Sequence, residues 1–160
     1  MDYEPDLYSV ATKIAVDALS RRARSRGELA QLLSRRAMPE EVAERLLDRL
    51  AAQKLLDDRA FAQEWAQLRH RSKGLSRRAL AQELRKRAIA PDLIDEALSA
   101  IAREDEVLAV RALIAKKLPS LIRVDDEIRY RRLHSFLARK GYSSSIISEA
   151  IPQELGLVVI

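Results

Sequence analysis

The chain has no cysteine and few glycines, prolines, histidines and aromatic residues. The absence of cysteine excludes disulfides, thiolate metal sites and cysteine nucleophiles. With two histidines, His70 and His134, a histidine-rich metal centre is also excluded. Four glycines and five prolines among 160 residues, with abundant Ala, Leu, Arg and Glu, favour helix throughout. No apolar run approaches the roughly 18 residues of a membrane span, and the acidic N-terminus is unlike a signal peptide, so we expect a cytoplasmic protein.

No combination of residues in the chain indicates an enzyme. The sequence contains neither a GxxxxGK[ST] phosphate-binding loop nor an HExxH zinc motif. Its adjacent acidic pairs, Glu40-Glu41, Asp57-Asp58 and Asp125-Asp126, each stand where a helix is expected to begin. That position favours helix capping over catalysis or magnesium binding. We therefore predict no catalytic residue, no metal site and no cofactor.

The net charge of +5 is distributed in bands along the chain. Residues 21–36, 69–87 and 129–140 are each rich in arginine and lysine, and acidic residues cluster between these segments. One interpretation is an ordinary solvated helix surface. The other is a surface that docks onto a polyanion or an acidic protein groove.

An internal repeat of about 50 residues underlies this banding. Residues 24–50 align with residues 75–101 without a gap, and a third copy follows with a two-residue slip. Equivalent leucines that should be buried are Leu29, Leu80 and Leu133. The repeat predicts three modules, 6–54, 55–102 and 103–155, of which the terminal one is the most diverged.

Each module is expected to contain three helices, which makes the chain all-α. The expected helices span residues 6–22, 26–37, 39–50, 58–73, 76–88, 91–102, 104–118, 126–140 and 144–152. In the first helix of the second module, Phe61, Trp65 and Leu68 predict a buried stripe. Short helices joined by short loops favour an elongated tandem array of helix-turn-helix-like modules. The path of the apolar tail after Glu154 is left open.

The second helix of the second module predicts a basic face opposite its buried edge. Arg78, Gln82 and Arg85 recur at i, i+4 and i+7, with Lys86 beside them. Equivalent positions of the first module carry less charge, so packing does not explain the excess, and we interpret the face as a binding surface rather than a solubilising one. The predicted residues for binding a filament or DNA are Arg69, Arg71, Lys73, Arg77, Arg78, Arg85, Lys86 and Arg87. A secondary basic patch comprises Arg129, Arg131 and Arg132.

The second module also carries a recognisable motif. The run Leu55-Leu56-Asp57-Asp58, followed by Phe61-Ala62, Trp65, Arg69, Lys73-Gly74 and Glu83-Leu84, resembles the signature of the bacterial RecX family of recombination regulators. The resemblance covers roughly residues 10–151. That family usually has Lys-Gly after the second helix of a repeat, but Arg36-Ala37 and Arg87-Ala88 stand there in the first two repeats. These two helices are therefore expected to end without a left-handed residue.

The resemblance implies a regulatory protein of recombination, repair and the SOS response. Such proteins bind the RecA recombinase filament on single-stranded DNA and restrain its growth, ATP hydrolysis and strand exchange. We expect a monomer, with DNA, single-stranded or duplex, as a further partner. The alternative function is a direct DNA-binding helix-turn-helix module, although the sequence lacks the Asn, Gln and Arg pattern of a base-reading helix.

Overall fold

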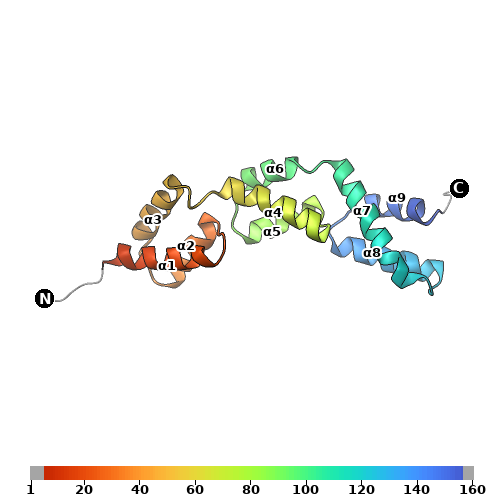
Figure 1. Cartoon of the computed structure of the whole chain (residues 1–160), viewed down its shortest axis with the longest axis horizontal. Coiled ribbons are helices and arrows are strands. Elements are labelled where there is room, and N and C mark those ends of the chain that lie inside the picture. Colours follow the sequence, from red (N-terminus) through yellow and green to blue (C-terminus); the bar gives the residue numbers. More distant parts are fainter. Residues whose placement is uncertain (1–5, 157–160) are drawn as a thin grey trace. The chain divides into compact units, whose positions relative to one another are not determined.

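The computed structural model describes residues 6–156, and all regular structure in this range is helical (Figure 1). The prediction of an all-α chain is confirmed. The helices are α1 (Leu7–Arg21), α2 (Arg26–Arg35), α3 (Glu40–Ala52), α4 (Asp58–Lys73), α5 (Arg77–Lys86), α6 (Pro91–Ser99), α7 (Arg103–Lys117), the 3₁₀ helix η1 (Leu118–Leu121), α8 (Asp126–Arg139) and α9 (Ser144–Leu155). Residues 157–160, which form most of the apolar tail, lie outside the described range.

Short polar side chains determine where several helices begin. The Ser25 hydroxyl accepts a 3.1 Å hydrogen bond from the backbone N–H of Glu28, and the Ser143 hydroxyl caps α9 in the same way. Asp57 accepts from the N–H of Ala60 at 3.0 Å, so it caps α4. Each of these oxygens satisfies a donor that the first helical turn leaves without a partner.

Two helix boundaries differ from the prediction. Pro39 is the N-cap of α3 rather than its first helical residue. Pro152 lies inside α9, which continues to Leu155 and ends at the left-handed residue Gly156.

The chain divides into two compact units. Unit 1 comprises residues 1–64 and 84–94, and unit 2 comprises residues 65–83 and 95–160. The boundary therefore passes through α4, α5 and α6, and each unit is described by itself below.

Each unit has an apolar core built from three successive helices. In unit 1, alanines of α1 pack with leucines of α2 and α3, and the buried set includes Ala11, Ala15, Leu29, Leu33, Leu46, Leu47 and Leu50. In unit 2, the buried set of α7, η1, α8 and α9 includes Val110, Ile114, Leu121, Leu133, Leu137, Ile147 and Ile151. The equivalent leucines Leu29, Leu80 and Leu133 are all fully buried, which confirms that prediction.

The buried stripe predicted for α4 is wrong in part. Leu68 is 62% exposed, and Phe61 and Trp65 are partly buried. The fully buried residues of this helix are Ala62 and Ala66. Small side chains let a neighbouring backbone approach closely, so this helix is buried along its alanines and the larger side chains lie beside that line.

All three second helices end on a left-handed residue, which corrects the expectation for the first two. Ala37 and Ala88 have φ values of 57° and 58°, and Gly141 has a φ of 94°. In each turn the left-handed residue and the one after it donate backbone hydrogen bonds to the last turn of the helix, as in Ala37 to Ser34 (2.9 Å) and Met38 to Leu33 (3.0 Å). This is a Schellman motif, repeated three times.

The Ala37 turn predicts a stabilising substitution. An L-residue with a side chain costs roughly 1–2 kcal/mol in the left-handed region, whereas glycine adopts it readily. Ala37 is exposed, so its methyl group contributes little packing. We expect Ala37→Gly to raise the free energy of unfolding by about 1 kcal/mol, as measured by urea denaturation. A loss of stability would contradict the assignment of this turn.

Candidate interaction surface

Arg69, one of the predicted binding residues, is engaged within unit 2. Its guanidinium forms two hydrogen bonds with the Glu83 carboxylate, of 2.6 and 3.0 Å, and lies over the ring of Trp65. The indole N–H of Trp65 donates to the same carboxylate at 2.9 Å. The hydrogen bond with Glu83 raises the pKa of Arg69. Arg69 and Trp65 therefore serve to join α4 to α5 in this unit.

The other predicted cations of unit 2 are exposed. They are Arg71, Lys73, Arg77 and Arg78, and none of them forms an ion pair among the described residues. Arg77 and Arg78 line a depression of about 310 Å³ that also includes Glu106. A carboxylate in this depression reduces its attraction for an anion.

The remaining predicted cations belong to unit 1. Arg85 and Lys86 are exposed at the C-terminal end of α5, where positive charge is favourable to the helix dipole. Arg87 is different, because its guanidinium lies 3.6 Å from the carboxylate of Glu28. That the cations of both units form one patch remains a prediction.

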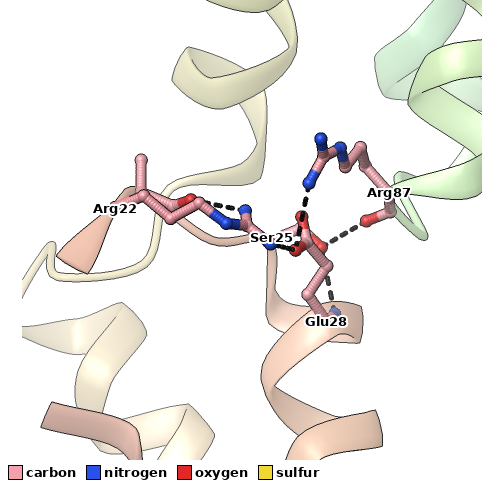
Figure 2. A network of polar contacts seen from close by, with 5 residues as sticks. Arg22, Ser25, Glu28 and Arg87 are labelled. Carbon is pink, nitrogen blue, oxygen red and sulfur yellow. Dashed lines mark hydrogen bonds and ion pairs between the residues drawn. The ribbon is translucent and has the colours of Figure 1, made fainter. Parts of the chain in front are cut away.

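Arg87 belongs to a polar network that we call the first junction (Figure 2). The Glu28 carboxylate accepts from Arg22 at 2.5 Å and faces Arg87, while the hydroxyl of Ser25 donates to the carbonyl oxygen of Arg87. The side chain of Glu28 is 10% exposed, and its Oε1 atom is buried without a hydrogen bond. At the same place Gly27 faces Ala88, and a Cβ atom on Gly27 would overlap the Ala88 methyl group.

Unit 2 contains the equivalent contact, the second junction, built without acidic residues. The backbone N–H of Ser76 donates to the carbonyl oxygen of Lys140 at 3.0 Å, and Lys140 Nζ donates to the carbonyl oxygen of Lys73 at 2.9 Å. The Tyr142 hydroxyl donates to the carbonyl oxygen of Gly74 at 2.9 Å. Burial, with a smaller effect of Glu106, raises the pKa of Tyr142 well above its ordinary value.

The two junctions join equivalent positions of the repeat. In each, the N-cap serine of one second helix, Ser25 or Ser76, contacts the carbonyl before the left-handed residue of the next, Arg87 or Lys140. Sequence reasoning missed both junctions, since the partners are more than 60 residues apart. The available sign was that Ser25 and Ser76 align without a gap, as do Arg87 and Lys140.

The secondary basic patch is divided by the structure. Arg129 donates hydrogen bonds to the carbonyl oxygens of Leu121, Ile122 and Val124 and pairs with Asp126. It therefore closes the loop between η1 and α8. Arg131 and Arg132, by contrast, are exposed and line a groove between these elements and α7.

The described residues 6–156 hold no group of three or more His, Asp or Glu side chains arranged to bind a metal ion. Over the same residues, no helix has both the length and the apolar character needed to cross a membrane.

Comparison with known proteins identifies all three modules. Family descriptions for the first, second and third three-helix domains of RecX match residues 11–50, 57–98 and 104–151. The regulatory protein RecX of Thermobifida fusca is 38% identical over 150 residues, covering 94% of this chain and 81% of that protein. The regulatory protein RecX of Streptomyces coelicolor is 42% identical over 145 residues, covering 91% and 77%.

Solved structures agree on the fold. The crystal structure of RecX from Lactobacillus salivarius matches with a TM-score of 0.82 at 22% identity, over 96% of this chain and 99% of that one. A crystal structure of a regulatory protein RecX matches with a TM-score of 0.77 at 26% identity, over 91% of this chain and 71% of that one. With its three domains matched in order and its relatives about 40% identical over most of their length, the chain belongs to the RecX family of regulatory proteins.

Proposed function

We propose that this protein binds the RecA recombinase filament on single-stranded DNA and inhibits filament growth, ATP hydrolysis and strand exchange. Membership of the RecX family carries the proposal, since all three domains are matched. The described residues provide basic side chains for such binding, and several of these have no acidic partner within the chain. Linked modules that each make a weak contact gain affinity through their effective concentration.

The experiment is the DNA-dependent ATP hydrolysis of RecA with this protein added below the RecA concentration. Inhibition is expected, because a regulator that acts on a filament affects many subunits per bound copy. Unchanged hydrolysis would contradict the proposal. If unchanged hydrolysis were accompanied by tight, sequence-specific duplex binding, the alternative of a direct DNA-binding module would replace it.

The exposed face of α5 should contribute to this activity. We expect replacement of Arg78, Arg85 and Lys86 by Gln to weaken inhibition of RecA. Stability should change by less than about 0.5 kcal/mol, because substitutions of exposed charges have small effects. The control is a triple variant of equal charge change, Arg35→Gln, Arg49→Gln and Arg103→Gln, whose side chains are exposed and form no ion pair among the described residues. Equal inhibition by both variants and the parent protein would leave the α5 face as a solubilising surface.

A further inference from the structure

Unit 2 contains a basic groove between α7, η1 and α8, with a volume of about 830 Å³. Four cationic side chains and two serines provide its polar lining, namely Lys117, Ser120, Arg131, Arg132, Ser135 and Arg139. Leu121 and Ile128 supply the apolar part. No carboxylate is among the described residues that line it, whereas the depression beside Arg77 includes Glu106 and that beside Lys13 includes Asp17.

The cations of this groove are available to a ligand. Arg131, Arg132 and Arg139 are exposed, and within residues 6–156 none of them forms an ion pair. Lys117 lies over the ring of Phe136, with Nζ 5.4 Å from the ring centroid, which restrains the side chain without neutralising its charge. Uncompensated positive charges held at one surface repel one another, and an anion that binds there relieves this repulsion.

The spacing of these cations fits a linear anion with several charges. From Arg131 to Arg139 the helix rises about 12 Å, at 1.5 Å per residue. Residues 128, 132, 135 and 139 recur at helical spacing, so they share one side of α8. Guanidinium groups bind phosphate oxygens through paired hydrogen bonds. The groove therefore suits a row of phosphates better than a single small anion.

We infer that this groove binds the phosphodiester backbone of single-stranded nucleic acid. A flexible single strand can enter a concave groove, and the apolar residues Leu121 and Ile128 can contact sugars or base faces. The described lining contains no asparagine or glutamine that could read base edges, so binding is independent of sequence. The inference rests on the proposed function in one respect: it assigns to the third domain the contact with the DNA strand inside the RecA filament.

The test measures binding of a fluorescent oligo(dT) to the full chain at several salt concentrations, without RecA. The variant replaces Arg131, Arg132 and Arg139 by Gln, and the control is the triple variant of Arg35, Arg49 and Arg103. If all three groove arginines contact phosphates, the slope of log affinity against log salt should fall by roughly 2, and affinity should fall roughly 100-fold at 0.1 M salt. The control variant should retain most of the affinity, and both variants should melt like the parent protein.

Unchanged oligo(dT) affinity in the groove variant would overturn the inference, as would an equal loss in the control variant. Duplex DNA that competes as well as single strands would overturn the preference for a single strand. A RecA assay then separates this inference from the proposed function. If the groove variant keeps its oligo(dT) affinity but no longer inhibits ATP hydrolysis, the groove binds an acidic protein surface and the inference is wrong. If the parent protein binds oligo(dT) but never inhibits RecA, the proposed function fails while the groove assignment stands.

Discussion

Replacement of Gly141 by alanine should lower the free energy of unfolding by about 3 kcal/mol. The new methyl group would overlap the Ser76 hydroxyl and lie 2.7 Å from the Ala79 Cβ atom, so the second junction would have to open. Overpacking of this kind costs roughly 1–3 kcal/mol. The left-handed backbone, with φ of 94°, adds roughly 1–2 kcal/mol for a residue with a side chain. Urea denaturation monitored by circular dichroism measures the loss.

Gly156 provides a matched control for this prediction. It also has a left-handed backbone, with φ of 66°, but a Cβ atom there would have no neighbour within 4 Å. Gly156→Ala should therefore show the conformational cost alone, roughly 1–2 kcal/mol. Equal losses for the two substitutions would mean that the second junction does not constrain residue 141.

Replacement of Gly27 by alanine should destabilise the protein by about 1–3 kcal/mol through overpacking of the first junction. The added methyl group would overlap the Ala88 methyl group and lie 2.9 Å from the Ala88 carbonyl oxygen. The direction is informative because alanine ordinarily favours a helix over glycine by about 0.5–1 kcal/mol. Ala88→Gly in the same chain should restore most of the loss, which gives a coupling free energy of at least about 1 kcal/mol.

The control for this rescue is Ala37→Gly in the Gly27→Ala background. Ala37 also has a left-handed backbone, with φ of 57°, but it is not among the atoms that a Cβ on Gly27 would meet. Its substitution should add its own stabilisation without removing the overlap. Additive effects of Gly27→Ala and Ala88→Gly in a denaturation cycle would show that the two residues do not contact.

The repeat could be predicted from the sequence because burial leaves a periodic pattern. Leu29, Leu80 and Leu133 occupy one position of a shared helix, and all three are fully buried. The same reasoning failed at Leu68, because it assigned the buried face of α4 to the largest apolar side chains. The helix instead buries Ala62 and Ala66, whose small size gives little weight in a hydrophobic pattern.

The candidate surface was less predictable, because helical spacing does not reveal which charges are neutralised by distant residues. Arg69 and Arg78 look alike in the sequence, but Arg69 binds Glu83 and Arg78 is exposed. Arg129 and Arg132 differ in the same way, since Arg129 closes a loop through backbone carbonyls. The groove combines residues of α7, η1 and α8, and no local pattern in the sequence links them.

The two junctions also restrict how the gene can lengthen. In the first junction an alanine methyl group faces a glycine, whereas in the second a glycine faces Ser76 and Ala79. A tandem duplication of the second module would place a copy of Ala88 opposite Ala79, at a position where the existing partner has no side chain. Each module is thus fitted to its own neighbour, and a fourth copy would need a compensating glycine before it could dock.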